Sequence, residues 1–354
     1  MKKSSATFLT PSYTLTVSVS LGTPVLHRDS NRDLISDVIP KTTEGQSVPS
    51  PPAIDTAPFH QDSLSNSTFN WKAALSLALA SKLAYESEVS VRSTCLGSAR
   101  AWGFDSCEFI DVDDTQCFVA SSPEIALVSF RGTESRGDWL RNINVPGRTR
   151  DYGIVHRGFL GAFQAVESRI RSTITGIHGR KLILTGHSLG GALATVMAAE
   201  WQNFMPASWI VTFGQPAVGT GAFQMFFQQH YFGKFFRFVN DDDIVPRVPP
   251  GYRHVGRLLH FDARGNLQNG QTLPQTEHLG VESLQLESQN QGLPMLSEAE
   301  YEVLQSRIGQ EVVRVNRSLS ESVSRPQSEG FFPSVNDHSL DKYIAKIIAK
   351  VGSR

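Results

Sequence analysis

The stretch Leu182–Ala194, which reads LILTGHSLGGALA, constrains the fold more than any other part of this chain. It runs from a short apolar segment through a serine between glycines into small helix-forming residues. A strand that turns directly into a helix puts the residue at its tip into a rarely populated backbone conformation, and it crowds the positions two before and two after. Gly186 and Gly190 meet that demand. The pattern predicts a G-x-S-x-G turn that presents Ser188 above a sheet; the alternative is a glycine-rich turn with an inert serine.

Short apolar runs alternate with helical patterns over most of the chain. Strands are predicted at residues 116–120, 125–130, 182–185, 210–213, 235–239 and 258–261. Helical patterns lie at 158–172 and 221–229, and Asn70 is placed to cap an earlier helix. This alternation predicts an α/β fold, in which a mostly parallel central sheet has helices on both faces. Ligands of such sheets bind beyond the carboxyl ends of the strands, where the turn would hold Ser188.

Two segments depart from this alternation. Residues 1–69 are rich in Ser, Thr and Pro and poor in large apolar residues, so we expect a flexible leader there and a globular domain over residues 70–354. Residues 270–333, rich in Gln, Ser and Glu, are predicted to form an irregular excursion with one helix near 297–315.

We find no signal peptide pattern and no apolar run of the roughly 18 residues that a membrane-spanning helix needs, so a cytoplasmic location is expected.

Charge and cysteine content exclude some classes of partner. The chain has 33 Lys and Arg residues against 34 Asp and Glu residues, which leaves a formal net charge of -1. No cluster of basic residues stands out, so nucleic acid is not an expected partner. Cys95, Cys107 and Cys117 form no metal-ligand pattern with nearby histidines, and neither a metal nor another cofactor is expected.

A nucleophilic serine needs a base to accept its proton and an acid to orient that base. After Ser188, a predicted strand runs into a loop with three carboxylates, any of which could be the acid: Asp241, Asp242 and Asp243. Four histidines follow this loop, namely His254, His260, His278 and His338. His338 is the favoured base because it directly precedes a helix with a single apolar stripe, which would hold it firmly. The alternative is an exposed histidine near a helix cap.

The tetrahedral oxyanion of an acyl transfer needs two hydrogen-bond donors. The backbone N–H of Leu189, at the start of the helix after the serine, is one candidate. The predicted strand at 125–130 ends in Arg131-Gly132-Thr133, a turn that could aim the N–H and hydroxyl of Thr133 at the same point. An ordinary strand-to-loop turn is the alternative.

Several motifs resemble those of the class 3 lipases, the fungal-type triacylglycerol lipase family. In chain order they are FRGT at 130–133 followed by Asp138-Trp139, VHRGF at 155–159, GHSLGGA at 186–192, TFGQP at 212–216, Val239-Asn240 with DIVP at 243–246, YRHVG at 252–256, and Asp337-His338. Their order and spacing together are highly specific. The resemblance covers residues 71–351 and is weakest across the excursion.

This resemblance implies an α/β-hydrolase fold and a serine hydrolase that cleaves carboxylic esters of lipids through an acyl-enzyme, without a cofactor. It implies that Ser188 is the nucleophile, Asp243 the orienting acid and His338 the base, with Thr133 and Leu189 as oxyanion donors. The family's lid maps to residues 134–144, which are less apolar here than a strongly interfacial lid would be. The partner it implies is a lipid or another ester, with transient contact to a membrane or lipid-droplet surface.

Two alternatives stay open at this point. A phospholipase or acyltransferase of the same fold would use the same catalytic set, with its specificity in acyl-pocket and lid residues. A non-catalytic hydrolase-fold module that binds lipid or protein is the second, since a fold does not guarantee an activity.

Overall fold

The computed structural model describes residues 57–96, 102–133, 139–140, 143–176, 179–268, 271–273, 293–318 and 335–352. All of them belong to one compact unit, residues 50–354. The predicted leader lies outside the described residues up to position 56. Its last part, 57–69, contains α1 (Asp62–Ser65), and Leu64 and Phe69 are buried in the core, so the packed unit includes residues before 70.

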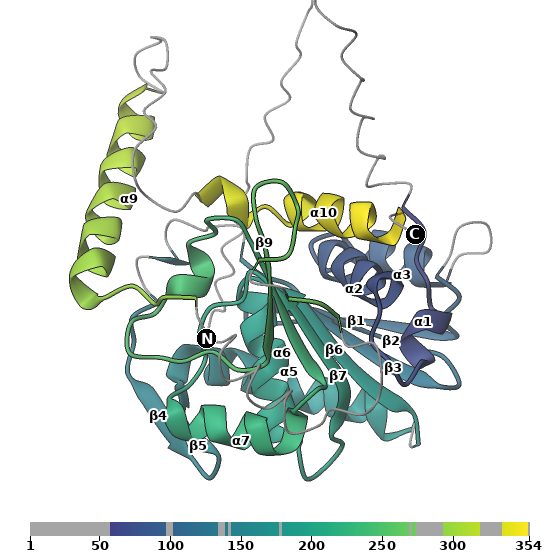
Figure 1. Ribbon diagram of the computed structural model, residues 1–354. Helices are drawn as coiled ribbons and strands as arrows, with labels where there is room; N and C mark the ends of the chain where they lie inside the picture. Colours follow the sequence, from purple (N-terminus) through teal and green to yellow (C-terminus); the bar gives the residue numbers. More distant parts are fainter. Residues whose placement is uncertain are drawn as a thin grey trace, which may run out of the picture. The chain divides into compact units, whose positions relative to one another are not determined.

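A seven-stranded sheet in the order β1-β2-β3-β6-β7-β8-β9 forms the centre of this unit (Figure 1). Its strands are β1 (Ser106–Val112), β2 (Thr115–Ser121), β3 (Ile125–Phe130), β6 (Lys181–His187), β7 (Ala207–Phe213), β8 (Phe235–Asn240) and β9 (Arg257–Phe261). The first two strands pair antiparallel, and the strands from β3 to β9 pair parallel. The mostly parallel sheet confirms the predicted α/β-hydrolase fold.

Helices cover both faces of the sheet, as predicted. Helices α2 (Trp71–Leu83) and α10 (Leu340–Gly352) lie side by side on one face, and α5 (Arg157–Thr175) and α6 (Leu189–Glu200) pack on the other (Figure 1). Alternate residues of the central strands β3, β6 and β7 enter one or the other of two apolar clusters, which explains why these strands are largely apolar. The side chain of Asn70 caps α2, accepting from the Ala73 N–H at 3.0 Å.

The remaining elements lie around this three-layer core. They are α3 (Glu88–Leu96), α7 (Gly221–Tyr231), α9 (Glu298–Ser318), two short 3-10 turns at Val245–Arg247 and Val335–His338, and a separate two-stranded sheet of β4 (Gly147–Arg150) and β5 (Gly153–His156). Helix α9 includes the helix predicted near 297–315 and packs on the core through the buried Tyr301 and Leu304. Residues 270, 274–292 and 319–333 of the predicted excursion lie outside the described residues.

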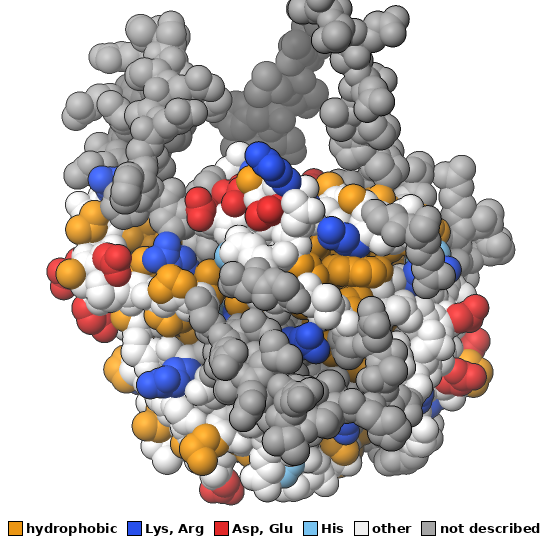
Figure 2. Space-filling view, viewed as in Figure 1, with side chains coloured by type: hydrophobic (Ala, Val, Ile, Leu, Met, Phe, Trp, Pro, Cys, Tyr) orange, Lys and Arg blue, Asp and Glu red, His pale blue; other side chains and the backbone are white. Residues whose placement is uncertain are grey.

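Charged side chains are spread over the visible face. On the face drawn in Figure 2, the Lys and Arg side chains of the described residues are scattered among acidic and apolar ones. In the part of the chain that the structure describes, no helix is both long and apolar enough to cross a membrane.

Candidate active site

Ser188 sits at the sharp turn between β6 and α6. Its backbone has φ 59° and ψ -129°, a conformation that costs energy for a residue with a side chain and that clusters at functional sites. The turn needs glycine two residues before it, because a Cβ on Gly186 would lie 2.3 Å from the carbonyl carbon of Gly190. The N–H of Ser188 donates to the Phe213 carbonyl at 2.9 Å, which ties the turn to the end of β7. The predicted elbow is therefore present.

Asp243 and His338 form a buried hydrogen-bonded pair. The Nδ1 atom of His338 lies 2.8 Å from Oδ2 and 3.0 Å from Oδ1 of Asp243, and both side chains are fully buried. Because a carboxylate only accepts, Nδ1 donates, and the neutral imidazole carries its lone pair on Nε2. This Nε2 atom and the hydroxyl of Ser188 are both buried and both lack a hydrogen-bond partner. The ring is thus held in the tautomer that a general base for serine requires.

Gly214 brings the serine turn and the Asp243–His338 pair together. It follows Phe213, the residue that holds the Ser188 N–H. A Cβ on Gly214 would lie 2.8 Å from Oδ2 of Asp243 and 2.8 Å from the His338 ring. His187, next to Ser188, adds a second link, since its Nε2 lies 2.8 Å from the His338 carbonyl and the two rings are 4.5 Å apart. The Ser188 hydroxyl and His338 Nε2 are not hydrogen-bonded to each other, as is common in an enzyme without substrate.

The other candidate acids and bases lie elsewhere. Asp242 is exposed, and the N–H of Asp241 donates to the Phe261 carbonyl at 2.8 Å. The Nε2 atoms of His254 and His260 are bonded to the carbonyls of Pro246 and Asp241. His278 lies outside the described residues. Of the three aspartates, the structure brings Asp243 against His338.

Leu189 directly follows the serine, and Thr133 follows a turn that packs against it. Leu189 is the first residue of α6, where N–H groups have no acceptor within the helix. The turn that ends in Thr133 packs against the elbow, because a Cβ on Gly132 would lie 2.7 Å from the His187 carbonyl and 3.2 Å from the Ser188 Cβ. These positions are compatible with two donors facing one oxyanion, and the roles of both residues stay predictions.

Tyr343 is a site residue that sequence reasoning missed. Its hydroxyl donates to Oδ2 of Asp243 at 2.5 Å, and the Val245 N–H donates to Oδ1 at 2.9 Å. Burial, and after it the charge and hydrogen bond of Asp243, raise the pKa of Tyr343 well above its ordinary value, so the hydroxyl stays a donor. Tyr343 belongs to the apolar stripe of α10 that predicted an anchoring helix. Its position in that stripe gave no indication of a polar partner.

Only parts of the predicted lid, residues 134–144, are described. Leu140 and Ile143 are buried in the core, and their carbonyls are bonded to the Tyr301 hydroxyl at 2.7 Å and to Nε2 of His156 at 2.6 Å. Residues 134–138 and 141–142 lie outside the described residues, so the lid stays a prediction.

Over the described ranges, no group of three or more His, Cys, Asp or Glu side chains is arranged to hold a metal ion.

Comparison with known proteins agrees with the motifs. The family model described as Lipase (class 3) matches residues 127–252. Over these residues the chain is similar to the class 3 lipases. The matched segment contains Thr133, Ser188, Leu189 and Asp243, whereas His338 lies beyond it. The family match by itself therefore does not cover His338, which the tertiary structure brings against Asp243.

Curated class 3 lipase relatives match over part of their length. Secreted mono- and diacylglycerol lipase 1 of Fusarium solani is 33% identical over 186 residues, which is 49% of this chain and 55% of that protein. Triacylglycerol lipase OBL1 of Nicotiana tabacum is 27% identical over 239 residues, 63% of this chain and 38% of that protein. The chain thus spans about half the length of the first of these and less of the second. The solved structure of Rhizomucor miehei triacylglyceride lipase aligns with a TM-score of 0.45 at 25% identity, covering 53% of this chain and 78% of that one.

Proposed function

We propose that this chain is a serine hydrolase that cleaves carboxylic esters of lipids through an acyl-enzyme on Ser188. The observation that carries the proposal is the buried bond between Asp243 and His338, which leaves Nε2 as an unpartnered acceptor near an unpartnered serine hydroxyl in a strained turn. Hydrogen-bonding groups buried without a partner cost free energy, and such groups concentrate where a substrate supplies the partner.

The reaction proceeds in two acyl transfers. In the first, Oγ of Ser188 bonds to the ester carbonyl carbon while its proton passes to Nε2 of His338, and the Thr133 and Leu189 donors stabilise the oxyanion. The intermediate collapses, the C–O bond to the alcohol breaks, and Nε2 returns the proton to the leaving oxygen. In the second, a water molecule attacks the acyl-enzyme in the same way and releases the acid and the free serine. Asp243 stays ionised throughout and stabilises the imidazolium.

Lipid esters are the substrate class that the relatives support. Their names describe mono- and diacylglycerol lipases and triacylglycerol lipases. Because such substrates collect at an interface with water, transient contact with a membrane or lipid-droplet surface is part of the proposal. A phospholipase is the second candidate, since chloroplastic phospholipase A(1) DAD1 of Arabidopsis thaliana is 29% identical over 149 residues.

A substrate panel tests the proposal. The purified chain is assayed on p-nitrophenyl esters of increasing chain length, a triglyceride emulsion and phospholipid vesicles, with Ser188→Ala as the blank. We expect Ser188→Ala to lower turnover by on the order of a million-fold. The matched control is Ser93→Ala, which changes an exposed serine on α3 and should leave turnover unchanged. Activity on phospholipid alone would replace the lipase assignment with a phospholipase one.

Covalent labelling separates an enzyme from a binding module of the same fold. A fluorophosphonate probe reacts with an activated serine, so we expect labelling of the unmodified chain and of Ser93→Ala but none of Ser188→Ala. Equal labelling of all three chains, or hydrolysis that survives in Ser188→Ala, would refute Ser188 as the nucleophile.

A further inference from the structure

Arg237 is a buried charge with no counter-ion among the residues that the structure describes. It lies in β8, its exposed fraction is 1%, and none of its Nε, Nη1 and Nη2 atoms has a hydrogen-bond partner. Burial alone lowers the pKa of Arg237 to about 9, with no carboxylate contributing. The guanidinium therefore remains charged at neutral pH. A charge buried in this way is strongly destabilising unless something pairs with it.

The strand register explains why no side chain pairs with Arg237. Its neighbours across the sheet are Thr212 on β7 and Leu258 on β9, neither of which is acidic. Phe236 and Phe238, on either side along β8, belong to the apolar cluster beneath α2 and α10. Because strand side chains alternate between faces, Arg237 points to the opposite face, the one covered by α6.

Further buried polar groups on this face also lack partners. The Thr212 hydroxyl and both ends of the Gln215 side-chain amide are buried without a hydrogen bond. They lie together against α6, since a Cβ on Gly191 would be 3.2 Å from the Thr212 Cβ and 3.1 Å from the Gln215 Cβ. Native proteins leave few such groups unsatisfied, and each one calls for an explanation, of which a bound ion is one.

His254 also lies near this group. After burial, the charge of Arg237 is the next cause that lowers the pKa of His254. Its Nε2–H donates to the Pro246 carbonyl, so its unpartnered Nδ1 is an acceptor, which can take a hydrogen bond from Arg237 or from the Gln215 amide. The histidine therefore offers an acceptor on this face but supplies no negative charge.

We propose that Arg237 is the centre of a buried binding site for a small monovalent anion, such as chloride, held by its guanidinium, the Thr212 hydroxyl and the Gln215 amide. One negative charge balances the guanidinium, and all three groups can donate a hydrogen bond to an anion. A bound water would satisfy hydrogen bonds but would leave the charge unbalanced. The anion supplies the negative charge that an acidic side chain at position 258 would otherwise provide.

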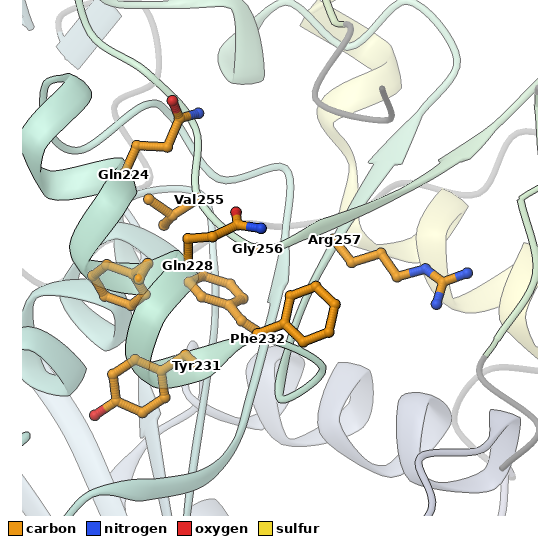
Figure 3. A pocket seen from close by; sticks show the side chains of 9 residues that line it. Gln224, Gln228, Tyr231, Phe232, Val255, Gly256 and Arg257 are labelled. Atoms are coloured by element: carbon orange, nitrogen blue, oxygen red, sulfur yellow. The ribbon is translucent and has the colours of Figure 1, made fainter. Parts of the chain in front are cut away.

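This site is distinct from the surface pocket nearby. Figure 3 shows that pocket, which lies between α7 and the segment Val255–Arg257, and Arg237 is not among the residues that line it. The Arg257 side chain in Figure 3 extends away from the other labelled side chains. The proposed anion site is also independent of the proposed hydrolase activity, because it uses none of Ser188, Asp243 and His338.

Thermal unfolding at constant ionic strength tests the proposal. We expect the Tm of the full chain to rise by about 2–4 °C when potassium gluconate, whose anion is too large to enter, is replaced by potassium chloride or bromide. Arg237→Met should abolish this dependence, and Arg148→Met, at an exposed arginine on β4, should preserve it. The same halide response in Arg237→Met as in the unmodified chain would overturn the site, as would the absence of any response in the unmodified chain.

A second variant covers the possibility that Arg237→Met does not fold. Leu258→Glu places a carboxylate opposite Arg237 in the register, so the guanidinium gains an internal partner. We expect this variant to lose the halide dependence while it keeps Arg237. Bromide-soaked crystals test the site directly. We expect an anomalous difference peak from bound bromide within hydrogen-bond distance of the Arg237 guanidinium. Water alone at that position would disprove the anion.

Discussion

The hydroxyl of Tyr343, on the last helix of the chain, donates a hydrogen bond to Oδ2 of Asp243, the same oxygen atom that lies 2.8 Å from Nδ1 of His338. A carboxylate held by two such donors and by the Val245 N–H has a single orientation. Helix α10 therefore holds both members of the pair, since it begins two residues after His338 and carries Tyr343. Positioning of the base depends on how this helix packs on the sheet.

Removing the Tyr343 hydroxyl should weaken catalysis without removing it. Tyr343→Phe keeps the ring in the core but deletes a hydrogen bond to a charged group, which is worth about 1.5–3 kcal/mol. If part of this bond aligns His338, we expect kcat to fall by about tenfold with KM little changed, measured on a soluble ester. An unchanged kcat in a variant whose Tm has fallen would assign the bond to stability alone.

The three neighbouring aspartates should differ sharply in effect. Asp243→Asn removes the charge that fixes the His338 tautomer, and we expect kcat to fall by about ten-thousand-fold. Asp242→Asn changes an exposed neighbour and should leave kcat within about twofold. Steady-state kinetics of the two variants side by side makes the comparison. Similar losses in both would contradict the assignment of Asp243.

Gly214 should not tolerate a side chain. Its φ is 58°, and a Cβ there would come within 2.8 Å of both Asp243 and His338, so we expect Gly214→Ala to lower kcat/KM by at least about a hundredfold. Gly251→Ala is the matched control, because Gly251 has φ 77° but nothing within 4 Å of the added carbon. The Gly251→Ala variant therefore carries the cost of backbone strain at positive φ without any close contact of the added methyl group. Equal losses of activity in the two variants would show that strain, and not contact with the pair, is responsible.

His254 should contribute to acid sensitivity. Burial and then the charge of Arg237 hold its pKa well below the ordinary 6.5, so the unfolded chain binds a proton that the folded chain does not. The stability from this difference is present above pH 6.5 and is lost as the pH falls below it. Chemical denaturation between pH 7.5 and 4.5 should show a shallower loss of unfolding free energy in His254→Gln, whose amide can still donate to Pro246. If the pH dependence of the unfolding free energy were unchanged in His254→Gln, the acid sensitivity would be assigned to other buried histidines. His156 is one of them, since burial also lowers its pKa.

Local signals in the sequence predicted most of the fold. The six predicted strands, the cap at Asn70 and the elbow at Ser188 are present, because each depends on apolar runs or glycines that act over a few residues. β1 was missed because it is an edge strand in which Glu108 and Asp111 interrupt the apolar pattern. β4 and β5 were missed because each has only four residues, and β4 is also largely exposed.

The sequence by itself determined the α/β architecture, the strained serine turn and a short set of candidate acids and bases. Local patterns left Asp241, Asp242 and Asp243 open, and the family resemblance favoured Asp243. The tertiary structure brings Asp243 against His338, and it alone turns the Tyr343 hydroxyl to the same carboxylate. It also decided that Arg237 lies beside Leu258 in the register and has no partner within the described ranges. The physical reason is distance along the chain: these contacts join residues that are far apart in sequence, and their geometry depends on strand register and helix packing, which no local pattern encodes.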